Sequence, residues 1–236
     1  IEESGSLESR YHFAPELIDL IKQYDGQEIG THTFSHYYCL EEGQSLTEFV
    51  EDLSSAIKIA KDEGISIRSI VFPRNQCNLE YLPALEELGI RCYRGTESSW
   101  LYNASDEGGQ SKIRRAARLM DAYLNLSGHH TYELQHCTKE KPFNFPSSRF
   151  LRPYSSKFSI LDGLKLNRIT RAMNDAAINH RIFHLWWHPH NFGINTQKNI
   201  NFLVKIINHY KALERSYGMR SLNMGELCLL SRITHG

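Results

Sequence analysis

The sequence predicts an α/β protein in which helices pack outside a sheet of short parallel strands, closed into a barrel or doubly wound. Apolar patterns with helical spacing alternate with short apolar runs, and a glycine or a proline ends most of these segments. Repeated strand and helix units of this kind require a parallel sheet covered by helices. Both architectures place functional residues at the carboxyl ends of the strands.

The elements expected in the first part of the chain alternate regularly. They are a helix over 13–24, a strand over 27–30, a helix over 45–63, a strand over 65–72, a helix over 79–88 and a strand over 90–94. The helix over 45–63 has clear end signals, because Ser45 and Glu48 form a capping box and Gly64 follows the last turn.

The rest of the chain is less regular before it returns to the same alternation. Residues 97–154 are rich in Ser, Asn, Gly, Pro and charge, apart from a helix expected over 112–124, and we interpret them as an insertion over one end of the barrel. A helix over 164–179, a strand over 182–188 and a helix over 196–217 follow. Because no internal repeat or linker-like tract occurs, residues 1–236 are expected to form one domain.

Composition excludes several classes of function. The 27 basic and 27 acidic residues balance, so no overall field attracts nucleic acid or an anionic membrane. No apolar run approaches the roughly 20 residues that span a bilayer. The five cysteines are odd in number and widely spaced, which argues against a disulfide framework and a thiolate metal site and favours a cytoplasmic location. The oligomeric state stays open.

Two histidines follow the strand expected to end at Gly30. His32 and His36 are four residues apart, so their imidazoles can lie on one side of a helical turn and reach a single cation. Nitrogen ligands favour zinc or a similar transition metal over calcium or magnesium. The alternative is that both histidines are ordinary exposed or core residues.

A second group of candidates, from Trp186 to Asn191, ends the late aromatic strand. Strand alternation places Trp186 and His188 on the same face, and Pro189 ends the strand where a loop begins. His188 is therefore a candidate general acid beside an aromatic wall, because an imidazole titrates near neutral pH. The alternative is a buried aromatic strand whose histidines are only hydrogen-bonded.

Two further candidates follow other strands. Arg74, in the segment Phe72-Pro73-Arg74-Asn75, can pair with a catalytic carboxylate and orient it, or it can be a surface residue in a turn. Trp100 lies in the loop after the strand over 90–94 and can stack on a sugar ring or serve in plain packing. The convergence of three strand ends is a stronger signal than any one of these residues.

These residues, in this order, resemble the polysaccharide deacetylases, the NodB-homology group within carbohydrate esterase family 4. His32-Thr33-Phe34-Ser35-His36, preceded by Glu28-Ile29-Gly30, is similar to the family's His-Ser/Thr-x-x-His metal motif. Phe72-Pro73-Arg74 stands where the family has an Arg-Pro strand end, and Trp186-Trp187-His188 stands where it has Leu-x-His. The resemblance covers residues 13–215, and its first motif is the specific one.

The resemblance implies a distorted (β/α) barrel that binds one divalent metal ion, with zinc as the expected metal, through an Asp and two His. It implies a hydrolase that removes an N- or O-linked acetyl group from a carbohydrate. His32 and His36 correspond to the metal ligands, Arg74 to the residue that orients the base, and His188 to the general acid. The expected partner is an acetylated glycan, contacted by Phe72, Asn75, Trp100, Trp186, His190 and Asn191.

Departures from the family pattern keep alternatives open. Arg74 follows the proline instead of preceding it, Trp186 replaces Leu, and His190 is an alternative to His188 as the acid. The family's first motif, Thr-Phe-Asp-Asp-Gly, supplies the base and the third metal ligand and does not occur in these residues. We therefore expect a barrel that lacks its first strand and has little activity. Two other hypotheses are a catalytically inactive carbohydrate-binding barrel and an unrelated metal-dependent barrel hydrolase or isomerase.

Overall fold

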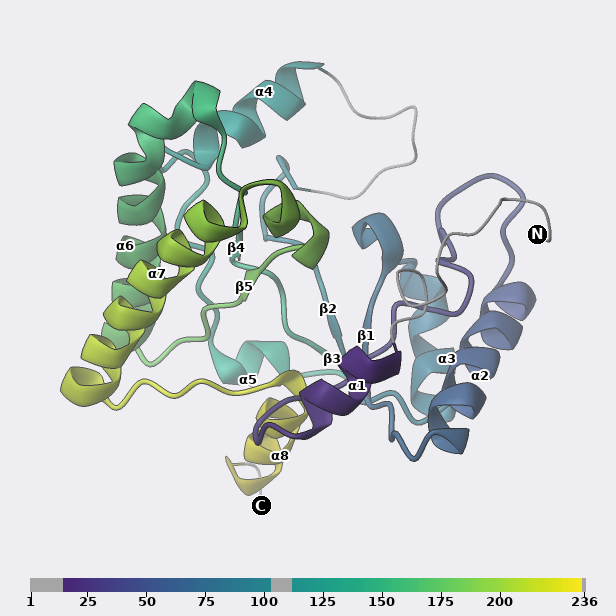
Figure 1. The fold of residues 1–236 in the computed structure, drawn as a ribbon. Helices are drawn as coiled ribbons and strands as arrows, with labels where there is room; N and C mark the ends of the chain where they lie inside the picture. The colour runs from purple at the N-terminus through teal and green to yellow at the C-terminus, as the bar shows by residue number, and fades with distance from the viewer. Residues whose placement is uncertain (1–14, 103–111, 235–236) are drawn as a thin grey trace.

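A computed structural model describes residues 15–102 and 112–234 of the chain as a mixed α/β structure (Figure 1). Its helices are α1 (Pro15–Lys22), α2 (Leu46–Asp62), α3 (Leu82–Glu87), α4 (Lys112–Asp121), α5 (Leu134–Cys137), α6 (Asp162–Ile178), α7 (Thr196–Tyr217) and α8 (Met224–Thr234). Its strands are β1 (Ser69–Val71), β2 (Cys92–Arg94), β3 (Phe143–Asn144), β4 (Arg149–Phe150) and β5 (Leu185–Trp186). Short 3-10 helices follow β1 at Pro73–Asn75 and β5 at Pro189–Asn195.

The strands form two small parallel sheets. β1 pairs with β2 and β2 with β3, in a register that sets Ile70 opposite Tyr93 and Tyr93 opposite Asn144. Thr31 makes a parallel bridge to Ile70, on the other side of β1 from β2. The second sheet contains β4 and β5. Because every pairing between these strands is parallel, the carboxyl ends of neighbouring strands lie at the same edge of each sheet.

One continuous segment, residues 143–150, connects the two sheets. It contains β3 and β4, and between them the Ser147 amide donates to the Gly95 carbonyl (2.9 Å) and the Ser148 amide to the His184 carbonyl (2.8 Å). Residues 97–154 therefore supply two strands as well as loops and helices. The interpretation of this stretch as an insertion over one barrel end is wrong for residues 143–150.

The described strands are arranged in the order Thr31, β1, β2, β3 with β4, and β5, and they do not close into a barrel. No backbone hydrogen bond connects the Thr31 segment to β5 within residues 15–102 and 112–234. The predicted α/β class with parallel strands is confirmed. The open arrangement is consistent with the incomplete barrel that the sequence predicts.

Helices flank the strands on two sides (Figure 1). α2 and α3 pack beside β1 and β2 through a core whose fully buried members include Phe49, Leu53, Ile70, Leu85 and Ile90. α6 packs along α7 through a second core that includes Leu151, Ile169, Met173, Phe192 and Ile206. These two cores support the strands from both sides and so hold the strand ends in place.

Helix ends follow the sequence signals closely, whereas strand lengths do not. Both hydrogen bonds of the capping box between Ser45 and Glu48 are present at the start of α2. α7 ends at Gly218, whose φ of 68° is the left-handed conformation that favours glycine. The apolar runs 65–72 and 182–188 contain only three and two residues of strand. No helix in the described parts of the chain is long and apolar enough to cross a membrane.

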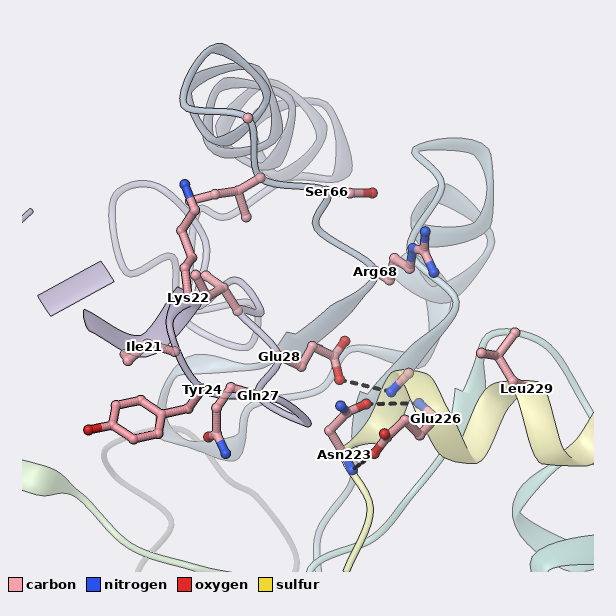
Figure 2. A pocket seen from close by; sticks show the side chains of 14 residues that line it. Ile21, Lys22, Tyr24, Gln27, Glu28, Ser66, Arg68, Asn223, Glu226 and Leu229 are labelled. Atoms are coloured by element: carbon pink, nitrogen blue, oxygen red, sulfur yellow. Dashed lines mark hydrogen bonds between the residues drawn. The ribbon is translucent and has the colours of Figure 1, made fainter. Parts of the chain in front are cut away.

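The C-terminal helix α8, which the sequence patterns did not reveal, docks at the opposite end of the sheet from the carboxyl ends. The Glu28 carboxylate accepts a hydrogen bond from the Gly225 amide (2.8 Å), and Asn223 and Glu226 cap the start of the helix reciprocally (Figure 2). The pocket in Figure 2 has a volume of about 430 Å³ and is lined by Glu28 and by Arg68, which directly precedes β1. This pocket therefore lies on the amino-end side of the sheet.

Candidate functional site

The loop with the first histidine pair is a tight turn that side chains hold in place. Thr33 and His36 have φ of 64° and 62°, which non-glycine residues rarely adopt. Thr33 Oγ1 accepts a hydrogen bond from the Tyr37 amide (2.8 Å). Asp52 of α2 accepts bonds from two amides that lie between His32 and His36 (2.7 and 2.9 Å). The strained turn is therefore anchored to α2.

The two imidazoles of this loop lie against each other, with ring centroids 4.7 Å apart. His32 Nδ1 is hydrogen-bonded to the Val71 carbonyl, and His36 Nδ1 lies 3.1 Å from the Tyr38 hydroxyl. A carbonyl partner makes Nδ1 of His32 the protonated nitrogen and leaves the Nε2 lone pair for a metal. Neither Nε2 has a hydrogen-bond partner among the described residues. The structure brings the two rings together as the spacing predicts, and their role as metal ligands stays a prediction.

A second strained turn follows β1. Arg74 and Asn75 have φ of 52° and 57°. Arg74 places its guanidinium 4.3 Å from the ring centroid of Tyr38, the residue that contacts His36, and Asn75 accepts a hydrogen bond from Arg94 Nη2 (2.7 Å). Four of the six non-glycine residues with positive φ in the described chain lie in these two turns, so backbone strain is concentrated at the strand ends. Strain of this kind gathers at functional sites.

The aromatic group after β5 contains the other candidate histidines. His188 lies edge-on to Trp186, with 5.4 Å between ring centroids, and stacks on His190 at 5.2 Å. Burial lowers the pKa of His188, and the charges of His190, Arg94 and His36 lower it further. His188 thus interacts electrostatically with a histidine of the first loop.

The pKa of His32 is lowered by burial, by groups of its own loop and by groups outside it. Burial is the largest cause that lowers its pKa, the hydrogen bond to the Val71 carbonyl opposes this effect, and the charges of His36, Arg94 and His188 lower the pKa further. Charge effects of this kind fall off with distance. Arg94 connects the ends of β5 and β1 by direct contacts, because it lies over Trp186 beside His188 and bonds to Asn75 in the turn that follows β1. That His188 shares a site with the first loop stays a prediction.

The remaining predicted substrate contacts divide between surface and core. Trp100 is 67% exposed and stands in a loop, whereas Phe72 is only 1% exposed and packs edge-on against Tyr93. Phe72 is thus a core residue, and the prediction that it contacts substrate is wrong. The Asn191 amide donates to the His188 carbonyl (3.0 Å), so this residue helps to shape the loop after β5.

The sequence patterns missed Arg94 and Tyr38. Arg94 is the last residue of β2, is 9% exposed, and holds its guanidinium 4.0 Å from the ring centroid of Trp186. A basic residue that ends an apolar strand was the signal available for it. Tyr38 lies two residues after the His-x-x-x-His motif and touches both His36 and Arg74. Its role depends on the fold of the loop, which the sequence does not give.

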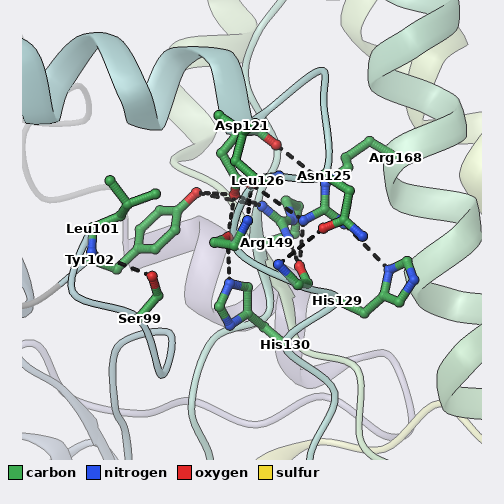
Figure 3. A network of polar contacts seen from close by, with 12 residues as sticks. Ser99, Leu101, Tyr102, Asp121, Asn125, Leu126, His129, His130, Arg149 and Arg168 are labelled. Atoms are coloured by element: carbon green, nitrogen blue, oxygen red, sulfur yellow. Dashed lines mark hydrogen bonds and ion pairs between the residues drawn. The ribbon is translucent and has the colours of Figure 1, made fainter.

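A second polar cluster surrounds Asp121 at the end of α4 (Figure 3). Asp121 is fully buried and accepts hydrogen bonds from Tyr102 (2.7 Å), Ser127 (2.7 Å) and Arg149 (2.5 Å), and Arg168 lies 3.5 Å away. Burial alone would raise the pKa of the Asp121 carboxyl, but these hydrogen bonds and the Arg149 charge hold it well below its usual range. The cluster joins α4, β4 and α6, and we interpret it as stabilising the fold.

The donor set of the first loop fits part of a metal site. His32 and His36 each keep Nε2 available while an oxygen holds the other ring nitrogen, which is how metal-binding histidines are usually oriented. Within residues 15–102 and 112–234, no group of three or more His, Cys, Asp or Glu side chains is placed to hold one ion. Catalytic zinc usually has three protein ligands. The predicted role of the histidine pair as metal ligands would supply two of these three.

Comparisons with protein-family models, curated proteins and solved structures found no match for this chain. The likeness to the polysaccharide deacetylases consequently depends on the motifs at 32–36, 72–74 and 186–188. The chemistry of the site has to be argued from these residues and their geometry.

Proposed function

We propose that this chain is a polysaccharide deacetylase-like catalytic domain, a distorted and incomplete (β/α) barrel. It would remove an N- or O-linked acetyl group from a carbohydrate with one zinc-like ion. The observation that supports the proposal most is the contact between His32 and His36 after one parallel strand, with His188 after another and Arg94 in contact with the turns beside both. Parallel α/β folds place their active sites at the carboxyl ends of their strands.

His32 and His36 would hold the ion through their Nε2 atoms. When bound, the ion would polarise the acetyl carbonyl and lower the pKa of the attacking water. The Val71 carbonyl orients the His32 ring and selects its tautomer. The Tyr38 hydroxyl contacts Nδ1 of His36, the same ring nitrogen that the Val71 carbonyl holds in His32. The guanidinium of Arg74 lies over the Tyr38 ring. Arg74 would therefore position His36 through Tyr38, in addition to the base-orienting role that the resemblance implies.

His188 is the proposed general acid. Burial and its charged neighbours lower its pKa, so its protonated form gives up the proton readily. It would deliver this proton to the departing nitrogen or oxygen of the sugar. His190 stacks on the same ring and is the alternative acid, since both histidines belong to one loop.

A catalytically inactive carbohydrate-binding barrel is the second candidate. Trp100 and Trp187 are 67% and 37% exposed, and Trp186 pairs with Phe150 at 4.6 Å beside His188. Aromatic faces of this kind can stack on sugar rings. Among the described residues, no carboxylate lies with the histidine pair as a third possible metal ligand. Such a protein would bind glycans without releasing acetate.

Acetate release from acetylated chitooligosaccharides, with added zinc or cobalt, distinguishes the two candidates. The chain would be compared with a form preceded by a strand that carries two adjacent aspartates. We expect the longer form to release acetate and the present chain to be nearly inactive, because no carboxylate of the described residues is placed with the histidines to take the proton of the water. In the longer form, His188→Gln should lower the rate by roughly 100- to 10,000-fold. His136→Gln, at an exposed position of α5, is the matched control and should leave the rate unchanged.

Each alternative outcome has a clear meaning. Glycan binding by both forms without acetate release would select the binding protein. Equal turnover by both forms would mean that the carboxylates come from within residues 1–236, and the assignment of a missing base would be wrong. A full rate in His188→Gln would transfer the role of acid to another group, with His190 as the first to test.

A further inference from the structure

A buried arginine at the end of β2 has no acidic partner. Arg94 is 9% exposed, packs its guanidinium on Trp186 and donates one hydrogen bond, from Nη2 to Asn75. It forms no ion pair with a residue in the described ranges 15–102 and 112–234. Arg149 and Arg168, the other deeply buried arginines discussed above, both pair with Asp121.

The carboxyl group that acts on Arg94 forms no ion pair with it. Glu97 is 4% exposed; burial raises its pKa, whereas a hydrogen bond from Ser147 and the charges of Arg149 and Arg94 lower it. Burial also lowers the pKa of Arg94 to about 10, so its guanidinium keeps the positive charge at neutral pH. A buried cation without an adjacent anion is unfavourable unless a ligand supplies the negative charge.

Several histidines lie within reach of the charge of Arg94. Its charge lowers the pKa of His32, His188 and the buried His184, in each case after the larger effect of burial. A metal ion on His32 and His36 would add further positive charge. The described part of the site therefore attracts anions.

Unpaired polar atoms gather at the same place. Five buried side-chain atoms of the described residues have no hydrogen-bond partner, and two of them are Arg94 Nε and Trp186 Nε1. The guanidinium of Arg94 lies over the Trp186 ring, so these two atoms belong to the same contact. Buried polar groups are normally paired. Two unpaired donors at one guanidinium indicate a place where a polar ligand group binds.

We propose that Arg94 is the receptor of an oxyanion, and that the site takes a negatively charged acetylated sugar that carries a carboxylate or a phosphate. Trp186 and Asn75 hold the guanidinium plane in position. A guanidinium recognises both oxyanions through paired hydrogen bonds. The acetyl part of this substrate rests on the proposed function, whereas the oxyanion receptor stands on Arg94 and its surroundings alone.

The test measures binding without metal, so that its failure is distinct from a failure of deacetylation. Titration calorimetry at low salt would compare neutral N,N′,N″-triacetylchitotriose, a hyaluronan tetrasaccharide that carries carboxylates, and UDP-N-acetylglucosamine, which carries phosphates. We expect at least one charged ligand to bind about ten- to a hundredfold more tightly than the neutral one, which corresponds to a hydrogen-bonded charge pair. Added salt should reduce this preference. Tighter binding of hyaluronan assigns a carboxylate, and tighter binding of the nucleotide sugar assigns a phosphate.

Substitutions test whether the preference for charged ligands depends on the Arg94 side chain. Arg94→Met should abolish the preference for the charged ligand. Arg94→Lys keeps the positive charge but loses the paired planar donors of the guanidinium, so it should retain part of the preference. This second variant keeps the test valid if Arg94→Met does not fold. Arg91→Met is the matched control, because Arg91 is exposed and precedes the same strand at its amino end.

Three results would overturn the oxyanion receptor. They are equal affinity for charged and neutral ligands, no binding of either charged ligand, and a preference that survives both substitutions of Arg94. Loss of metal binding or of acetate release with the preference intact would overturn the deacetylase proposal and leave the receptor in place.

Discussion

Two buried arginine clusters of this protein have opposite construction. In the Asp121 cluster, a carboxylate accepts hydrogen bonds from Tyr102, Ser127 and Arg149 and lies beside Arg168 (Figure 3). At the end of β2, Arg94 has an amide and an aromatic ring as partners and no carboxylate among the described residues. In the first cluster a carboxylate pairs with two guanidinium groups, and in the second a guanidinium has no ion-pair partner among the described residues.

The backbone shows the same difference. The turns that carry His36 and Arg74 hold non-glycine residues at positive φ, whereas Asp121 ends a regular helix and Arg149 begins a strand. Strain and unpaired polar groups both destabilise a fold. The strand-end turns contain four of the six non-glycine residues with positive φ in the described chain. The Asp121 cluster contains one, His130, and it also leaves Arg149 Nε unpaired. The two regions therefore differ more in their ion pairing than in unpaired polar atoms.

The largest expected effect is on the Asp121 cluster. Asp121→Asn removes the negative charge and leaves Arg149 and Arg168 buried without an anion, so it should reduce the free energy of unfolding by about 3–5 kcal/mol. Urea denaturation at neutral pH measures this quantity. Asp19→Asn, on the exposed side of α1, is the control and should stay within about 0.5 kcal/mol. Equal effects of the two substitutions would show that the cluster does not stabilise the fold.

Acid should destabilise both regions through one histidine in each. Burial lowers the pKa of His130, beside Asp121, and of His184, near Arg94, to about 4. The unfolded chain binds these protons near pH 6.5 and the native chain only near pH 4, so this stability is complete above pH 6.5 and is lost as the pH falls towards 4. Each histidine should contribute about 3 kcal/mol to the loss.

Urea denaturation at pH 7 and pH 4.5 measures this loss. The fall in the free energy of unfolding should be clearly smaller in His184→Gln than in the wild type, since one of the two buried imidazoles is gone. His136→Gln, at an exposed position, should behave like the wild type. A fall of the same size in all three proteins would mean that His184 is protonated in the folded state at mild acidity.

The smallest expected effect is on stability at Arg94. Because its charge has no acidic partner to leave behind, Arg94→Met should change the free energy of unfolding by less than about 1 kcal/mol, or even stabilise the fold. Arg149→Met should cost about 3 kcal/mol or more, since it removes a partner of the buried Asp121 carboxylate. Denaturation of the two variants side by side is the measurement. Similar losses would make Arg94 a structural residue.

Helices could be predicted from this sequence much better than strands. The bounds expected for the helix over 196–217 agree with α7, because its amphipathic pattern is long and Gly218 supplies the end signal. β3 and β4 have only two residues each and include Asn144 and Arg149, so no apolar run marks them. Their pairing depends on contacts with β2 and β5, which a local pattern does not encode.

The candidate site could be predicted in part for the same reason. Spacing was enough to predict that His32 and His36 lie together, whereas the role of His188 stays a prediction from its place at a strand end. Phe72 was misassigned because the side chain of an aromatic residue at a strand end can point either into the candidate site or into the hydrophobic core. Arg94 was missed because its importance comes from what is absent around it, an acidic partner, and only the fold shows this.

Cobalt(II) binding, followed by visible absorption, tests the central claim most directly, because it asks whether His32 and His36 share one metal ion. The account predicts one bound equivalent, an affinity that falls more than about tenfold in both His32→Ala and His36→Ala, and no change in His136→Ala. Equal binding by all four proteins, or no binding by the wild type, would contradict it.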